Sequence, residues 1–178
     1  MRLVLETERL RLVLPGTEAA PLLVRHYREN AAHRDRWDPP RPPSFLTLPY
    51  WRTRLAEALR EYGRRQSARL VLFHEDEVAG TCNFTQVRAG ACRVGYGLDR
   101  RYEGKGFMSE TLRAAIPYVF SEFPVKKIFA NYLEANVRSA RLLERLGFEP
   151  DGRERKIEHG RVLEHVRVVL GKARPSAP

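Results

Sequence analysis

The chain has 178 residues, of which 43 % are hydrophobic and 30 % are charged. These proportions exclude global disorder, and the length suits one domain with its own core. The 32 Lys and Arg residues outnumber the 22 Asp and Glu residues, giving a formal net charge of +10, and no stretch approaches the roughly 20 apolar residues of a membrane span.

The first residues, MRLVLETERLRL, contain neither a long apolar segment nor a small-residue cleavage site. They do not resemble a signal peptide, so we expect a cytoplasmic protein. Two cysteines, Cys82 and Cys92, lie outside any C-x-x-C pair, so neither a zinc site nor a disulfide framework is expected. The basic charge favours attraction to polyanions. No nucleic-acid-binding motif accompanies it, so no sequence-specific nucleic-acid binding is predicted.

Hydrophobic periodicity and turn residues predict an α/β domain with a mixed sheet. In chain order the expected elements are a strand (9–14), a helix capped by Thr17 (17–30), a helix capped by Thr47, three strands (69–74, 78–87, 91–98), a helix (106–122), a strand (127–133), a helix (136–146), and a hairpin (148–157 and 162–170) around His159-Gly160. Residues 35–43 contain four prolines and are expected to be irregular. The second helix is predicted to bury Trp51, Leu55, Ala58, Leu59 and Tyr62. Residues 1–170 are expected to form one domain, and residues 171–178 a frayed tail.

Residues 100–110, RRYEGKGFMSE, connect a predicted strand to a predicted helix. Gly104 and Gly106 allow a tight turn, and the helix behind them begins with free N–H groups and the positive end of its dipole. Arg101 and Lys105 add positive charge, so the segment predicts an anion cradle suited to a pyrophosphate. It is neither a Walker A loop nor a complete dinucleotide-binding fingerprint, because a required Lys and a third Gly are missing.

Asn136 and Ser139 are three residues apart at the start of a predicted helix, so both project from one side of it. Asn136 is a good helix cap, which is one explanation of its presence. The other is that its amide binds a cofactor chain while the Ser139 hydroxyl donates a proton.

Taken together, these segments resemble the GNAT acetyltransferase superfamily. Its acyl-CoA loop, R/Q-x-x-G-x-G/A, is matched by residues 101–106. A T-x-R-L-x-L start (7–12), a W-D-P segment (37–39) and an N-x-x-S-x-x-L-L-x-x-L-G-F block (136–148) resemble the Rim-type branch, which acetylates the N-terminal alanine of ribosomal proteins. Residues 80–84 and 130–132 look like the RimJ part of that branch. The resemblance implies a GNAT fold with a mixed, mostly antiparallel seven-stranded sheet flanked by about four helices.

The resemblance also implies direct transfer from acetyl-CoA as co-substrate, without a metal, in a gap where strand 92–98 is splayed from strand 127–133. The implied cofactor-binding residues are Leu98, Arg101, Tyr102, Gly104, Lys105, Gly106, Phe107, Asn136 and Ser139. Ser139 is the implied proton donor to the leaving thiolate. Asp38 stands where related enzymes have Glu and is the first candidate base, with Glu103 and His165 as others. The candidates for lining the acceptor channel are Trp37, Asn83, Tyr96 and Tyr132.

Three functions remain open from the sequence. The first is acetylation of a ribosomal-protein N-terminus by a monomer or homodimer. The second keeps the fold but takes a small amine as acceptor, such as an antibiotic or an aminoacyl conjugate. The third is an acyl-CoA-binding protein without transfer activity. Fold and acyl-CoA loop are shared by all three, so they do not separate them.

Overall fold

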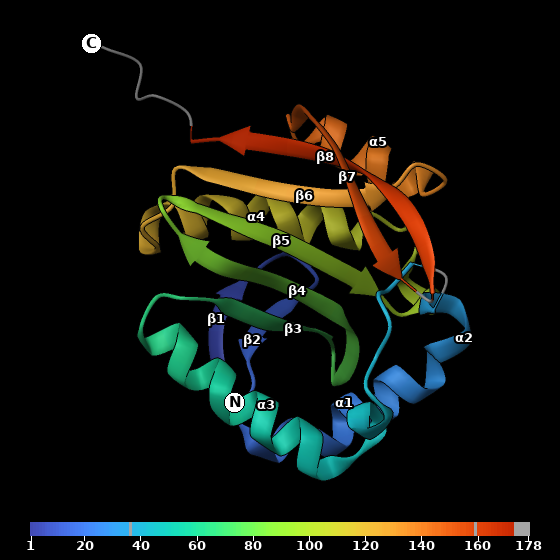
Figure 1. Ribbon diagram of the computed structural model, residues 1–178. Coiled ribbons are helices and arrows are strands. Elements are labelled where there is room, and N and C mark those ends of the chain that lie inside the picture. Colours follow the sequence, from blue (N-terminus) through green and yellow to red (C-terminus); the bar gives the residue numbers. More distant parts are fainter. Residues whose placement is uncertain (36, 159, 173–178) are drawn as a thin grey trace.

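The computed structural model describes residues 1–172, apart from 36 and 159. In that part of the chain there are eight strands and five α-helices (Figure 1). The strands are β1 (Arg2–Glu6), β2 (Arg11–Leu14), β3 (Ala68–His74), β4 (Glu77–Arg88), β5 (Ala91–Leu98), β6 (Lys127–Leu133), β7 (Glu149–Glu158) and β8 (Arg161–Gly171). The helices are α1 (Ala20–Glu29), α2 (Ala31–Arg34), α3 (Leu48–Gly63), α4 (Phe107–Glu122) and α5 (Val137–Arg145). Short 3-10 helices lie at Thr17–Ala19, Pro43–Leu46 and Arg100–Tyr102.

All eight strands form one sheet in the order β1-β2-β3-β4-β5-β6-β8-β7. Every neighbouring pair is antiparallel except β5 and β6, which run parallel because α4 carries the chain from one to the other. That parallel pairing joins only Ala91 to Lys127, Cys92 to Ile128, and Arg93 to Phe129. Beyond these three pairs the strands diverge, as the green and orange arrows in Figure 1 show. The splayed strands implied by the family resemblance are therefore present.

The sheet separates two apolar clusters, because successive side chains of a strand point to opposite faces. In β3, Leu70 and Leu72 face the cluster that includes α4, whereas Val71 and Phe73 face the cluster that includes α1 and α3. Both faces of the sheet are thus covered by helices. The helices do not fill the opening between β5 and β6, so a site can lie there.

The α/β fold with a mixed, mostly antiparallel sheet is confirmed, but the sheet has eight strands and not seven. The additional strand, β1, is a short edge strand paired only with β2 and mostly accessible to solvent. Such a strand lacks the buried alternation by which the others are found. The irregular proline segment is preceded by the four-residue helix α2, which was also not predicted.

Details of the helix ends differ in part from the prediction. Thr47 caps α3 as expected, its Oγ1 accepting a hydrogen bond from Tyr50 N at 3.4 Å. Thr17 does not cap α1, because it lies within a 3-10 turn that precedes that helix. Leu59 was predicted to be buried but is 39 % exposed.

The first two residues of the predicted tail belong to the folded part of the chain. Gly171 belongs to β8, and Lys172 is held by hydrogen bonds to the carbonyl groups of Lys126 and Phe120. The predicted turn residue His159 and the rest of the tail, 173–178, lie outside the described residues.

Candidate functional site

A cavity of about 1680 Å³ opens where β5 and β6 separate. This volume exceeds the usual range of single small-molecule pockets, roughly 300–1,000 Å³, and leaves room for a cofactor and an acceptor together. It is bordered by the two splayed strands, the start of α4, the start of α5 and the proline segment after α2. Its wall includes these predicted site residues: Trp37, Asp38, Asn83, Tyr96, Leu98, Gly104, Gly106, Phe107, Tyr132, Asn136 and Ser139.

The glycine loop forms one wall of this cavity. Gly104 and Gly106 have φ angles of +74° and +82°, which side-chain-bearing residues rarely adopt. Within the described residues, the backbone N–H groups of positions 104–109 have no intramolecular acceptor. A Cβ placed on Gly104 would meet nothing within 4 Å. The loop therefore offers donors and open space together, as an anion cradle requires.

Three predicted cofactor residues, Arg101, Tyr102 and Lys105, do not line the cavity in the part of the chain that is described. Arg101 donates through Nε and Nη2 to the buried Asp99 carboxylate at 3.1 and 3.0 Å, and through Nη1 to Glu77 at 2.7 Å. The Tyr102 hydroxyl donates to the same Glu77 carboxylate. These side chains brace the loop from outside the cavity, so their contribution to it comes through the backbone.

The Asp99 carboxylate anchors this brace to Asn30, the residue that follows α1. It accepts a hydrogen bond from Asn30 Nδ2 at 3.1 Å, while Asn30 Oδ1 accepts from Arg100 N. Burial by itself would raise the pKa of Asp99, but the hydrogen bonds from Arg101 and Asn30 outweigh burial and lower the pKa to about 2. The loop is thus tied to the helical layer through an ionised carboxylate.

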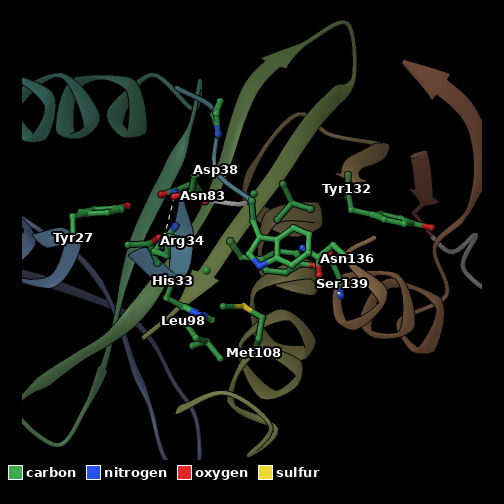
Figure 2. A pocket seen from close by; sticks show the side chains of 18 of the residues that line it. Tyr27, His33, Arg34, Asp38, Asn83, Leu98, Met108, Tyr132, Asn136 and Ser139 are labelled. Carbon is green, nitrogen blue, oxygen red and sulfur yellow. Dashed lines mark hydrogen bonds and ion pairs between the residues drawn. The ribbon is translucent and has the colours of Figure 1, made fainter. Parts of the chain in front are cut away.

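The start of α5 forms another wall of the cavity, and Figure 2 shows Asn136 and Ser139 there. Asn136 caps the helix, because its Oδ1 accepts from Ser139 N at 3.1 Å. Its Nδ2 has no acceptor among the described residues, so the cap leaves a donor for a ligand. The Tyr96 hydroxyl from β5 is hydrogen-bonded to Ser139 Oγ at 2.8 Å, and burial raises the pKa of Tyr96 to about 12. Tyr96 therefore keeps its proton at neutral pH.

The proline segment brings acidic and aromatic side chains to the cavity. Asp38 Oδ2 accepts from Arg34 Nε at 3.0 Å and from Arg41 Nη2 at 2.6 Å. Figure 2 shows the Arg34–Asp38 pair on the other side of the view from Asn136 and Ser139. These two guanidinium groups compete with any amine for the same carboxylate oxygen.

The two further candidate bases lie in different settings. Glu103 lines the cavity, but His33 Nε2 lies 2.6 Å from its Oε1 and Arg138 pairs with its Oε2. His165 is 7 % exposed and faces the cavity from β8.

Glu158 was not among the sequence candidates. It is 8 % exposed, lines the cavity, and places its Oε2 3.3 Å from Nε2 of His165. Its neighbour Ile157 is 80 % exposed. An acid turned inward beside an apolar residue turned outward reverses the usual pattern of a strand, and this reversal is the signal that could have identified Glu158.

The cysteines do not offer a nucleophile. Cys82 and Cys92 are buried and unpaired in β4 and β5. Burial raises the pKa of both thiols, that of Cys92 to about 12, so neither is a thiolate at neutral pH. Among the described residues there is also no group of three or more His, Cys, Asp or Glu that could hold a metal ion. No helix in the same part of the chain is long and apolar enough to span a membrane.

Chemically, the cavity combines an anion-binding loop on one wall with a hydroxyl pair and an amide donor on the other. These features fit coenzyme A: phosphates need free N–H groups, and a pantetheine chain needs an extended gap with exposed strand edges. The residues present therefore suit an acyl-CoA cofactor.

Comparisons with known proteins agree with this chemistry. The profile of the acetyltransferase (GNAT) domain family matches residues 9–149. The ribosomal protein uS5-alanine N-acetyltransferase of Escherichia coli is 36 % identical over 174 residues, covering 93 % of this chain and 89 % of the relative. The structure of the ribosomal-protein-S5-alanine acetyltransferase from Vibrio fischeri superimposes with a TM-score of 0.89 at 25 % identity, covering 94 % of this chain and 95 % of that one. The fold is also shared, with a TM-score of 0.86 at 18 % identity and coverage of 96 % and 98 %, by RimL, a ribosomal L7/L12 α-N-protein acetyltransferase in complex with coenzyme A.

Proposed function

The chain belongs to the acetyltransferase (GNAT) domain family, and from this premise we propose that it transfers the acetyl group of acetyl-CoA to the N-terminal alanine of a ribosomal protein. The observation that carries the proposal is the opening between β5 and β6, with free N–H groups on one wall and the Tyr96–Ser139 pair on the other. The choice of acceptor is supported by the name of the 36 % identical relative. A ribosomal acceptor implies a cytoplasmic location. In this proposal residues 1–170 act as one acetyltransferase domain.

The two walls would hold different parts of the cofactor. The N–H groups of positions 104–107 would bind the pyrophosphate, and the net charge of +10 would speed its capture. The backbone at Leu98, where β5 ends unpaired with β6, and the Nδ2 donor of Asn136 would bind the pantetheine arm. Bound there, acetyl-CoA supplies an acetyl group activated as a thioester.

Ser139 would supply a proton to the thiolate that leaves. The Tyr96 hydroxyl, 2.8 Å from Ser139 Oγ, would donate a hydrogen bond to that oxygen as the Ser139 proton moves to the thiolate. Because burial raises the pKa of Tyr96 to about 12, this residue serves as a donor and not as a base. General acid help of this kind typically contributes about 10²–10⁴-fold, and a thiol is a good leaving group, so the lower end applies.

The acceptor amine must lose a proton before it attacks. An α-amine has a pKa of about 7.7–8.0 against about 10.4 for Lys, so roughly a tenth of an N-terminal substrate is already neutral at pH 7. Asp38 remains the predicted base. Glu158, buried beside His165 at 3.3 Å, is a second candidate, since no guanidinium group of the described residues pairs with its Oε2. Trp37, Asn83 and Tyr132 line the same cavity and would contact the acceptor.

The test is to mix the protein with acetyl-CoA and a panel of acceptors and to follow release of the CoA thiol. The panel contains Ala-initiated ribosomal-protein peptides, the same peptides with a blocked N-terminus, Lys-bearing controls and small amine drugs. We expect turnover on the free Ala peptides alone. Turnover confined to small amines would show that the acceptor is a small amine and not a protein N-terminus. Acetyl-CoA binding without turnover on any acceptor would favour an acyl-CoA-binding protein.

A further inference from the structure

The Thr7-Glu8-Arg9 segment before β2 has no role in the site described so far, yet it contacts the start of α4. Thr7 Oγ1 donates to Glu110 Oε1 at 2.6 Å, and Arg9 N donates to the same oxygen at 2.9 Å. Arg9 Nε donates to Glu110 Oε2 at 2.7 Å, and Arg9 Nη2 lies 2.6 Å from that oxygen. All four contacts cross about a hundred residues of sequence and meet on one carboxylate in the first turn of the helix.

The same guanidinium group reaches three consecutive residues of the glycine loop. Arg9 Nη1 donates to the Lys105 carbonyl oxygen at 3.0 Å, and its Nη2 lies 3.5 Å from where a Cβ of Gly106 would stand. Its guanidinium carbon lies 4.3 Å from the centre of the Phe107 ring. Neither Arg9 nor Glu110 lines the cavity in the described part of the chain, so these contacts reach the loop from behind.

This arrangement matters because two of the loop residues are glycines. Gly104 and Gly106 both adopt positive φ, and glycine loses more conformational freedom on folding than any other residue. A ligand that bound a mobile loop would have to order it, and the conformational entropy lost would weaken binding. Burial by itself would raise the pKa of Glu110, but hydrogen bonds from Thr7 and Arg9 outweigh it and lower the pKa, so the carboxylate is ionised at neutral pH.

We propose that Thr7, Arg9 and Glu110 form a loop clamp, a positioning cluster that holds residues 104–107 in their phosphate-binding conformation before the cofactor arrives. This inference rests on the proposed function, because it takes coenzyme A as the ligand. The clamp touches neither the reacting atoms nor the acceptor. Its loss therefore weakens cofactor binding and leaves the chemical step unchanged.

The experiment titrates coenzyme A into each variant by calorimetry and measures kcat and the KM for acetyl-CoA separately. We expect Arg9→Ala to weaken coenzyme A binding about tenfold, with kcat at saturation within about twofold of wild type. Glu110→Gln keeps the side-chain volume and the packing of Phe107 and should weaken binding to a similar extent. Combining the two changes should weaken binding little further, because both remove the same interaction between Arg9 and Glu110.

Two further variants separate positioning from charge. Arg11→Ala removes an equally basic residue two positions away, which donates to the Glu75 carbonyl at 2.5 Å and pairs with Asp76; its coenzyme A affinity should equal wild type. Arg9→Lys keeps the charge but not the planar fork that joins Glu110 to the Lys105 carbonyl, so it should bind as weakly as Arg9→Ala. Thermal unfolding of each variant without ligand checks that the fold is retained.

Wild-type affinity in both Arg9→Ala and Glu110→Gln would overturn the loop clamp, and so would full rescue by Arg9→Lys. A fall in kcat without a change in coenzyme A affinity would overturn it as well. Each of these results leaves a wild-type protein that binds coenzyme A, so the proposed function survives. Failure of the wild-type protein itself to bind coenzyme A would instead remove both.

Discussion

Replacing Gly104 by Glu tests the anion cradle most directly, because the structure separates its effect on binding from its effect on folding. Gly104 has a φ of +74°, and a Cβ there meets nothing within 4 Å. The cost to folding is therefore only the backbone strain of a left-handed residue, about 1–2 kcal/mol. The protein should remain folded.

The cost to binding is far larger. Two like unit charges 4 Å apart repel by about 4 kcal/mol at an effective dielectric constant of about 20, which corresponds to roughly a thousandfold in affinity. Solvent screening reduces this, so we expect Gly104→Glu to weaken coenzyme A binding by at least about a hundredfold. Gly104→Gln adds similar bulk without the charge and should lie between Glu and wild type.

The matched control is Gly90→Glu. Gly90, in the turn between β4 and β5, has a φ of +75°, also has nothing within 4 Å of a Cβ, and does not line the cavity. Both Glu variants should lose the same small amount of thermal stability, yet only Gly104→Glu should lose affinity in calorimetric titration with coenzyme A. Equal affinity in the two variants would refute the placement of the pyrophosphate against the Gly104 loop.

Three further changes test the rest of the site and its support. Ser139→Ala should lower kcat about a hundredfold and leave coenzyme A affinity nearly unchanged, as rapid-quench and binding measurements would reveal. If Glu158 accepts the amine proton, Glu158→Gln should lower kcat/KM about a hundredfold at pH 7 and Asp38→Asn far less, with the exposed Glu134→Gln as control; the reverse order would identify Asp38. The folded-state pKa of Asp99, about 2, lies below the ordinary value of an Asp. The ionised carboxylate therefore stabilises the fold by about 2 kcal/mol above about pH 5, and this contribution is lost as the pH falls toward 2. Denaturant unfolding from pH 6 to pH 2 should show a loss about 2 kcal/mol larger in the wild type than in Asp99→Asn, because other carboxylates with a lowered pKa, such as Glu110, titrate in both.

Local signals predicted the parts of the structure that depend on neighbouring residues. The positive φ of Gly104 and Gly106, the cap at Asn136 and the cap at Thr47 all follow from residue types within a few positions of one another. The splayed strands also came out as expected, but from the family resemblance and not from periodicity. Periodicity places a strand in a sheet and does not say where its pairing stops.

The remaining features depend on partners distant in sequence. Arg101 was expected to add positive charge to the anion cradle, yet Glu77 and Asp99 hold its side chain outside the cavity, and only the folded chain brings Glu77 within 2.7 Å. The inward position of Glu158 likewise depends on His165 across the β7–β8 hairpin. A sequence pattern gives the face of a strand, but the identity of the side chain opposite comes from register.

The three residue pairs between β5 and β6 also affect the local opening of the sheet. They are the sole ladder between a five-stranded part, β1 to β5, and a three-stranded part, β6 to β8, in the described chain. Past Arg93 and Phe129, the facing N–H groups of the two strands belong to interior edges, although they lie in the middle of the sheet. Amide hydrogens there should exchange with solvent faster than those of β4 and β8 on either flank, and slow down when a ligand bridges the gap. The opening in the centre of this sheet is therefore less protected than the strands on either side of it.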